Sequence, residues 1–266
     1  MRMEVLSLFR ERRLNELLRY ITVHDEASVA ELVNHFSVSA MTVRRDLAML
    51  EQAGQISRTH GGAVALHVLD GEEIYENKLA RNYDVKQRIA QKAFSLIQSL
   101  PEGHAPPQSI FLDSGTTTYQ IALLMKKLIG IYLFTNDVRI AAEIYRYPLN
   151  AFMVGGRIQP ETSCVCGPPC NAYVDSLNFE LCVIGVSAVN PKLMLSSPSE
   201  EKAYSKQNVM KHSRIKILVC DKSKFNRIAL FNVTSITAFD YVITDYEFTH
   251  AQQKQLSEGK VVVLHV

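Results

Sequence analysis

Short polar segments follow several apolar runs of the chain, and their side chains are suited to holding a small anion. The clearest is DSGTTT at 113–118, which stands between an apolar run at 109–112 and a helix expected at 117–128. Hydroxyl groups and unpaired N–H groups at a helix N-terminus favour an anion such as phosphate. The lysine and spacing of a P-loop are absent, and an ordinary Ser/Thr helix cap without a ligand is the alternative interpretation.

Three further polar segments occupy equivalent places after other apolar runs. They are TND at 135–137, GGR at 155–157 and DKSKF at 221–225. Alone, each has an ordinary explanation as a helix cap, a turn or a pair of solvated lysines. Because the carboxyl ends of parallel strands meet at one edge of a sheet, we expect the four segments to converge on a polar, anion-compatible pocket for a small molecule.

A second group of candidate functional residues lies near the N-terminus, where arginines and short polar side chains share one side of an expected helix. Arginine can donate two hydrogen bonds to a guanine edge, and threonine can contact a phosphate or a thymine methyl group. The pattern predicts contact with DNA through Ser39, Met41, Thr42, Arg44, Arg45, Arg58 and His60. The alternative is a small helical subdomain whose charged face is simply solvated.

Capping signals predict where the helices of this N-terminal region begin. A serine and a glutamate three residues apart, starting at Ser28, form a capping box, and Ser39 is a second N-cap candidate. A supporting helix is expected at 11–24, and residues 55–62 are expected to form a hairpin after Gly54 ends the last helix. Elements in this order predict a winged helix-turn-helix.

The helix that follows Ser39 is expected to have one buried and one exposed side. Its apolar residues recur at spacings of three, four and three, which predicts a buried stripe of Ala40, Val43, Leu47 and Leu50. The arginines fall on the opposite side, together with Asp46. A carboxylate that faces phosphates is unfavourable, so we expect Asp46 to orient Arg45 or to cap a neighbouring element.

Further along the chain, short apolar runs alternate with helical segments. Strands are expected at 109–112, 132–134, 151–154, 181–184, 216–220 and 241–244, and helices at 85–100, 117–128, 138–146, 200–213 and 248–257. This alternation predicts an α/β fold with a mainly parallel sheet. The predicted organisation is a DNA-binding domain at 1–66, a linker at 67–84 and an α/β effector-binding and oligomerisation domain at 85–266.

Composition sets broad limits on the function. The chain has 266 residues, 47% of them hydrophobic and 21% charged, which is typical of globular proteins. The formal net charge is +2, and residues 1–66 hold eight arginines and eight acidic residues, so only the local clustering of arginines supports DNA binding. With no signal peptide and no apolar run near the roughly 18 residues of a membrane helix, we expect a cytoplasmic protein without a membrane partner.

The cysteines predict neither disulfides nor a metal site. There are five, all in the second half of the chain, and an odd number without a signal peptide favours reduced thiols. The cluster Cys164-x-Cys166-x3-Cys170 lacks the usual Cys-x2-Cys pairing, and no histidine or second cysteine pair follows at zinc spacing. We therefore expect no bound metal and no cofactor.

Both parts of the chain resemble one family. Residues 28–63, and above all the TVRRDL core followed by a glycine, a short strand and a basic-Gly-Gly wing, resemble the N-terminal signature of the DeoR/GlpR-type bacterial transcriptional regulators. The second part matches the effector domain of the same family in FLDSGTTT at 111–118, TND at 135–137, VGGR at 154–157, VIGVS at 183–187 and DKSKF at 221–225. The matches cover nearly the whole chain in the right order.

The resemblance implies a repressor that responds to a metabolite. In such proteins the second domain is similar to the fold of ribose-5-phosphate isomerases and CoA transferases, and a phosphorylated sugar usually releases the protein from its operator. A homo-oligomer, a dimer or tetramer, would present two winged domains to symmetric half-sites. Carried over to this sequence, the effector site would consist of Asp113, Ser114, Gly115, Thr116, Thr117, Asn136, Gly155, Gly156 and Lys224.

Two departures from the family pattern leave other functions open. The loop at 101–108 is longer and richer in proline than usual. In the segment at 190–206, residues 190–198 stand where the family has a glycine-containing turn, and Glu201 and Lys206 lie near but not in the usual Glu-to-Lys register of the following helix. One alternative is an isomerase-like enzyme with an attached DNA-binding domain, in which Asp113, Asp137 or Glu201 would act as acid or base. The other is a DNA-binding scaffold whose pocket has been closed by the altered segment.

Overall fold

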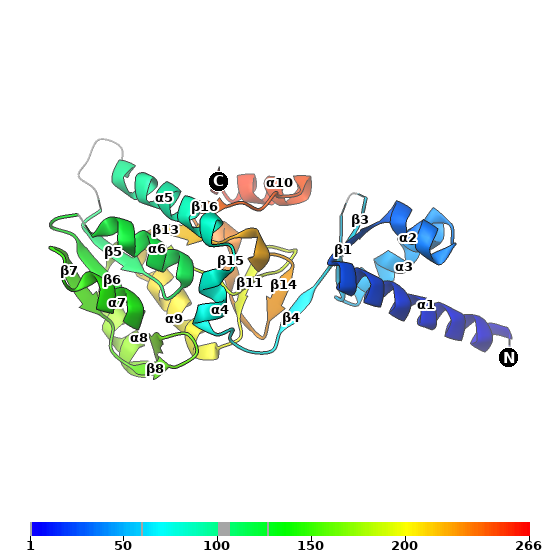
Figure 1. The fold of residues 1–266 in the computed structure, drawn as a ribbon, viewed down its shortest axis with the longest axis horizontal. Helices are drawn as coiled ribbons and strands as arrows, with labels where there is room; N and C mark the ends of the chain where they lie inside the picture. Colours follow the sequence, from blue (N-terminus) through cyan, green and yellow to red (C-terminus); the bar gives the residue numbers. More distant parts are fainter. Residues whose placement is uncertain (1, 60, 101–106, 127) are drawn as a thin grey trace. The chain divides into compact units, whose positions relative to one another are not determined.

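The computed structural model describes residues 2–59, 61–100, 107–126 and 128–266. Its residues form two compact units, Met1–Val68 and Leu69–Val266, which are described separately (Figure 1). The expected linker at 67–84 differs from what is observed, because the second unit begins at Leu69. Tyr75, within that segment, is buried in the second unit and starts the short helix α4 (Tyr75–Ala80).

The first unit contains three helices and a small antiparallel sheet. The helices are α1 (Arg2–His24), α2 (Val29–Phe36) and α3 (Ala40–Gln52), and the strands are β1 (Glu26–Ser28), β2 (Ile56–Arg58) and β3 (Gly62–Ala65) in the order β1-β3-β2. Leu17 and Ile21 of α1 pack with Leu32 of α2 and with Val43 and Leu47 of α3 in one hydrophobic core. The predicted winged helix-turn-helix is therefore confirmed.

Local side-chain caps explain why these helices start where they do. Ser28 accepts a hydrogen bond from the Glu31 amide, and Glu31 accepts one from the Ser28 amide, so the predicted capping box is present. Ser37 ends α2 in the left-handed conformation with φ of 52°, and Ser39 then caps α3 by accepting from the Thr42 amide. The turn between the two helices is thus closed by serines at both ends.

A seven-stranded sheet organises the second unit, in the order β17-β16-β13-β10-β5-β6-β7. The neighbouring strands of this sheet pair in parallel, as predicted. Its strands are β5 (Ser109–Leu112), β6 (Tyr132–Thr135), β7 (Asn150–Met153), β10 (Phe179–Ile184), β13 (Ser213–Val219), β16 (Tyr241–Thr244) and β17 (Val262–His265). The chain moves outward from β5 in one direction and from β10 in the other, so the strand order reverses between these two strands.

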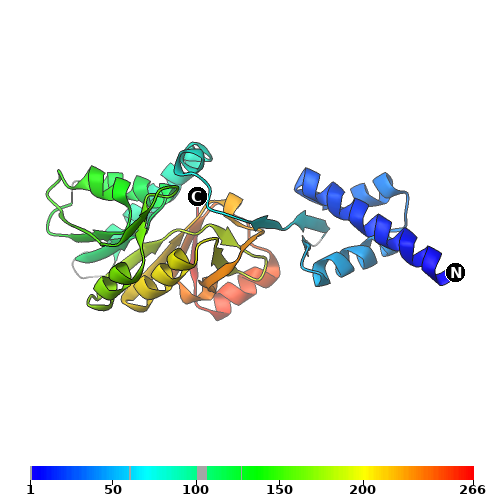
Figure 2. The ribbon, with the colours of Figure 1, turned by 90° about the horizontal axis from the view of Figure 1, so that it is seen from below.

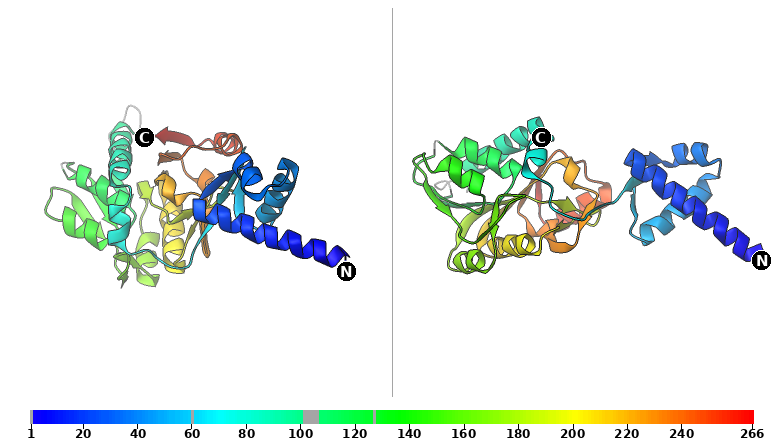
Figure 3. Two further views of the ribbon diagram at one scale, coloured as in Figure 1. Left: turned by 45° about the vertical axis from the view of Figure 1, so that its right-hand side comes forward. Right: turned by 60° about the horizontal axis from the view of Figure 1, so that its bottom comes forward.

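Helices cover both faces of this sheet. One face packs against α5 (Tyr83–Ser99), α6 (Thr116–Met125) and α7 (Val138–Ile144), and the other against α8 (Pro168–Asp175), α9 (Glu200–Lys211) and α10 (His250–Glu258). Alternate residues of β5 serve the two cores, with Ile110 and Leu112 on the first face and Phe111 on the second. Figures 2 and 3 show the sheet between the green α6 and α7 and the yellow α9.

Several elements of the second unit were not predicted. They are α4, β8 (Arg157–Gln159) with β9 (Cys164–Cys166), β11 (Ala188–Val189) with β12 (Met194–Ser197) and β15 (Phe231–Ser235), and β14 (Arg227–Ala229), β17 and the 3-10 turns η1 (Lys222–Lys224) and η2 (Ile236–Ala238). The strand β4 (His67–Leu69), whose residues span the boundary between the units, was not predicted either. Pro168 and Pro169 begin the helix α8, since proline is favoured in the first turn of a helix.

Within the described ranges, no helix is both long and apolar enough to cross a membrane. The same ranges contain no cluster of three or more histidine, cysteine or acidic side chains that could hold a metal ion.

Candidate functional site

The first turns of α3 present an exposed face in the first unit. Arg44 and Arg45 are exposed, and Met41 has 81% of its surface accessible. Thr42 is half-buried, and its hydroxyl lies 2.9 Å from that of Ser39. Ser39 and Thr42 therefore shape the N-terminus of the helix, while the arginines are free to meet a partner with their guanidinium groups.

Two expectations about α3 are wrong. Ala40 is exposed, because it lies at the first position of the helix, ahead of the turn that packs into the core. Asp46 is completely buried, and its Oδ2 accepts a hydrogen bond from Arg13 Nε of α1 at 2.6 Å. Asp46 thus fastens α3 to α1 instead of orienting Arg45, and the exposed face of the helix carries no competing carboxylate from this residue.

A hairpin formed by β2 and β3 follows α3. Arg58 is exposed at the end of β2, and its amide donates to Glu51 Oε1 of α3 at 3.1 Å. A Cβ atom on Gly62 would lie 2.0 Å from the carbonyl oxygen of Ala27, so only glycine allows β3 to pair with β1 at this position. His60, which we expected to contact DNA, lies outside the described residues.

A cavity of about 80 Å³ opens in the second unit where the strand order reverses. Its lining comes mainly from loops after β5, β10 and β13, from α9 and from the segment that precedes α4. The lining residues are Leu69, Gly71, Glu72, Glu73, Lys78, Ser114, Gly115, Thr116, Thr117, Thr118, Gly185, Val186, Ser187, Pro198, Lys202, Lys206, Val219, Cys220, Asp221, Lys224 and Arg227. Five of the nine residues expected at the effector site are among them.

The loop between β5 and α6 is held by side chains from the end of β6. Asn136 Oδ1 accepts from the Ser114 amide at 2.8 Å, and Asp137 Oδ2 accepts from the Gly115 amide at 3.1 Å. The helix itself starts at Thr116 without a side-chain cap. The amides of its first turn therefore stay available to an anion, whereas Asn136 positions the loop without lining the cavity.

Asp113 is neutralised by a buried lysine. Its Oδ2 accepts hydrogen bonds from the Gly185 amide at 3.1 Å and from Lys206 Nζ, and both side chains are almost inaccessible. Lys206 Nζ also donates to the carbonyl oxygen of Gly185 at 3.0 Å. The ion pair connects the loops after β5 and β10 to α9, so Asp113 supports the cavity and does not oppose an anion inside it.

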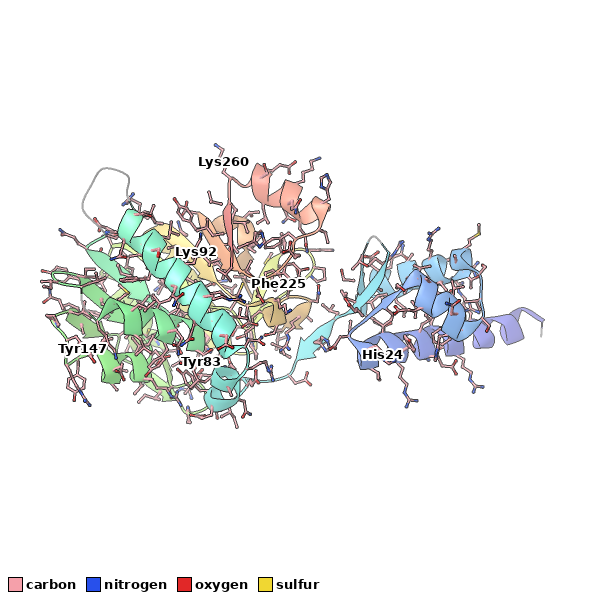
Figure 4. The ribbon with its side chains drawn as sticks, turned by 45° about the horizontal axis from the view of Figure 1, so that its top comes forward. His24, Tyr83, Lys92, Tyr147, Phe225 and Lys260 are labelled. Carbon is pink, nitrogen blue, oxygen red and sulfur yellow. The ribbon has the colours of Figure 1, made fainter. Side chains whose placement is uncertain are left out.

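The remaining lining contains both basic and acidic side chains. The basic ones are Lys78 of α4, Lys202 and Lys206 of α9, Lys224 of the turn η1 and Arg227 of β14, and the acidic ones are Glu72, Glu73 and Asp221. Burial lowers the pKa of Lys224, and the charge of Asp221 acts against that shift. The turn that carries Lys224 is anchored by Phe225 (labelled in Figure 4). Phe225 is buried and stacks on Tyr246, with ring centroids 3.8 Å apart.

Comparison with known families agrees with this geometry. The DeoR C terminal sensor domain matches residues 81–246, and the DeoR-like helix-turn-helix domain matches residues 13–68. The chain belongs to the DeoR family of transcriptional regulators. The resemblance seen in the TVRRDL and DSGTTT segments is thereby confirmed.

This DeoR-family chain is similar to other transcriptional regulators over almost the full length of both sequences. The HTH-type transcriptional regulator GlpR of Haloferax volcanii is 31% identical, with 98% of each chain covered. The glycerol-3-phosphate regulon repressor of Escherichia coli strain K12 is 28% identical, over 88% of this chain and 90% of its own. Ribose 5-phosphate isomerase A from Neisseria gonorrhoeae aligns with 55% of this chain and 54% of its own, at 15% identity and a TM-score of 0.37.

The residues that line the cavity of the sensor unit differ in part from those expected. Gly155 and Gly156 do not line it; a Cβ on Gly156 would lie 2.6 Å from the carbonyl oxygen of Cys166, so this glycine serves the pairing of β8 with β9. Lys202, Lys206 and Arg227 were missed. Because α9 is buried on most sides, its lysines do not stand out from the helix pattern, and only the proximity of position 206 to the end of β5 reveals its role.

Proposed function

We propose that this regulator is a repressor of a carbohydrate-metabolism operon and that a phosphorylated sugar bound in the cavity releases it from its operator. The observation that carries the proposal is the uncapped N-terminus of α6, which shares a cavity with Lys202, Lys206, Lys224 and Arg227. Backbone amides and lysine or arginine side chains are the groups that bind phosphate in proteins. The names of the relatives, a glycerol-3-phosphate regulon repressor among them, support a phosphorylated metabolite.

The operator would be bound by α3 and the hairpin that follows it. Exposed arginines at 44 and 45 suit the major groove, and Arg58 on the hairpin suits the phosphate backbone. Ser39, Met41 and Thr42 are placed in the first turn of α3, where recognition helices contact base edges. We further propose that the chain acts as a homo-oligomer, dimer or tetramer, since paired half-sites need two reading helices.

We infer that the sensor unit does not catalyse a reaction. Each of the three candidate acids is engaged by the fold: Asp113 by Lys206, Asp137 by the amides of Gly115, Arg139 and Ile140, and Glu201 by Arg157. Burial raises the pKa of Asp137, but its oxygens accept backbone hydrogen bonds and are not aimed at the cavity. A general base needs a free oxygen within hydrogen-bonding reach of a substrate.

The proposal can be tested by measuring the thermal unfolding midpoint of the protein with each of a panel of sugar phosphates and with each parent sugar. A ligand at one hundred times its dissociation constant stabilises the folded state by about 2.7 kcal/mol, so a specific sugar phosphate raises the midpoint and its parent sugar does not. Lys224→Ala should abolish most of this shift because it removes a cationic group from the lining.

Lys222→Ala is the matched control for that experiment. Lys222 lies two residues away in the same turn, is exposed and does not line the cavity, so its loss should leave the shift intact. An equal shift in wild type and Lys224→Ala would remove Lys224 from the site. No shift with any phosphorylated sugar would overturn the effector class.

A further inference from the structure

The cavity already contains a negatively charged side chain of its own chain. Glu72 lies in the segment that joins β4 to α4, and only 11% of its side chain is accessible. Lys202 Nζ is 3.1 Å from its Oε1, and Lys78 Nζ is 3.3 Å from its Oε2. The carboxylate thus occupies a position between two lysines that line the cavity.

Each oxygen of this carboxylate faces one lysine. Glu72 Oε1 is buried against Lys202, and Oε2 faces Lys78. Burial, followed by the charge of Lys202, lowers the pKa of Lys78 to about 8 even with Glu72 beside it. An anion with more oxygen atoms than a carboxylate, such as phosphate, would satisfy both lysines better.

The size of the cavity shows that something must move before a sugar phosphate can enter. Its volume of about 80 Å³ is far below the range of about 300–1,000 Å³ in which small-molecule sites fall. Residues 69–73 form one side of the cavity, and residues 70–74 belong to neither a helix nor a strand. Of the lining, this segment can therefore move away from the cavity with the least disruption of helices and strands.

We propose that Glu72 is an internal competitor of the effector: it holds residues 69–74 against the cavity, and the phosphate of the effector displaces it from Lys202 and Lys78. This inference rests on the proposed phosphate-binding function of the cavity. Glu72 would then signal binding, because its side chain leaves its position between Lys202 and Lys78 when the effector binds.

The anchoring of α4 limits the movement to that segment. Lys86 Nζ of α5 donates to the carbonyl oxygens of Lys78 and Arg81 at the end of α4, and the Tyr75 amide donates to the Glu161 carbonyl oxygen at 3.0 Å. With α4 held, displacement of Glu72 changes the path of the chain only between Leu69, the first residue of this unit, and Ile74. The change is thereby delivered to the residues that directly follow the DNA-binding unit in the sequence.

Titration calorimetry of the full chain with inorganic phosphate tests the competition. Glu72→Gln removes the competing charge and keeps the shape of the side chain, so it should bind phosphate about tenfold or more tightly than wild type, equivalent to roughly 1.4 kcal/mol. The matched control is Glu76→Gln, which makes the same change of net charge. Glu76 pairs with Arg139 at 2.8 Å and is not among the residues that line the cavity, so the affinity of this variant should stay within about twofold of wild type.

Hydrogen exchange supplies the second readout. Phosphate should accelerate amide exchange in residues 70–74 of the wild type, and Glu72→Gln should show fast exchange there without phosphate. Equal phosphate affinities in wild type and Glu72→Gln, or protection of residues 70–74 by phosphate, would overturn the competitor role while leaving the phosphate site in place. Absence of phosphate binding in wild type and both variants would overturn the proposed function itself, and with it this inference.

Discussion

Lys206 and Asp113 are the residues on which the geometry of the cavity depends most directly. Their side chains are only 4% and 2% accessible, so removal of one partner leaves a buried charge without compensation. Lys206→Met should lower the free energy of unfolding by about 3–5 kcal/mol, measured by urea denaturation. The double variant Lys206→Met with Asp113→Asn should recover part of this loss, since no uncompensated charge is left. Equal losses in the single and double variants would refute the ion-pair explanation.

Arg45 and Arg12 give a matched test of the DNA-reading face. Both are exposed arginines of the first unit, but Arg45 lies on α3, whereas Arg12 lies on α1 and pairs with Glu16 at 3.3 Å. On DNA selected from a random pool, Arg45→Ala should weaken binding by about 1–3 kcal/mol, or roughly five- to 150-fold in a mobility-shift titration. Arg12→Ala should bind like wild type. Unchanged affinity for Arg45→Ala would remove α3 from the interface.

At the scale of elements, the hairpin after α3 depends on one glycine. A Cβ at Gly62 would lie 2.0 Å from a backbone oxygen of β1, whereas a Cβ at Gly61 would have nothing within 4 Å. Gly62→Ala should therefore destabilise the first unit by about 1–3 kcal/mol, because the backbone must shift, and Gly61→Ala should change it little. Thermal unfolding followed by circular dichroism compares the two; similar midpoints would show that β1 and β3 can separate without loss.

Elements with local signals could be predicted from the sequence. The capping serines at 28 and 39 act on amides within three residues, and the strands at 109–112 and 241–244 are continuous apolar runs buried on both faces, so their boundaries agree with the structure. The α/β class and the mainly parallel sheet follow from the alternation of such runs with helices. Short elements such as β8 and β9, at three residues each, carry too few residues to show a period.

Contacts between distant residues could not be predicted. Asp46 with Arg13, and Asp113 with Lys206, join positions 33 and 93 residues apart. Asp46 was expected to orient Arg45 or to cap a neighbouring element, and Asp113 to line the effector site, because a single sequence does not show which charges are paired inside the fold. The pocket was thus expected at the ends of β5 and β13, whose loops line the cavity, but also at the ends of β6 and β7, whose loops do not. Two of its lysines come from α9, a helix whose orientation the sequence leaves open.

At the scale of the whole molecule, the two units have separate hydrophobic cores. Leu47 belongs to the core of the first unit and Leu133 to one of those in the second, and both are fully buried. Leu47→Ala and Leu133→Ala should each lower the free energy of unfolding by about 2–5 kcal/mol, but each should affect a different calorimetric transition. A sugar phosphate should raise the midpoint temperature of the transition whose midpoint Leu133→Ala lowers. A single transition shifted equally by both substitutions would show that the units unfold together.

The ion pairs of Glu72 also set the dose at which the regulator responds. When the binding-competent form is only a fraction of the population, the apparent dissociation constant rises by the inverse of that fraction. A carboxylate resident between Lys78 and Lys202 therefore raises the concentration of effector needed for half-maximal release without altering which effector is chosen. Substitutions at position 72 would therefore tune this threshold for induction.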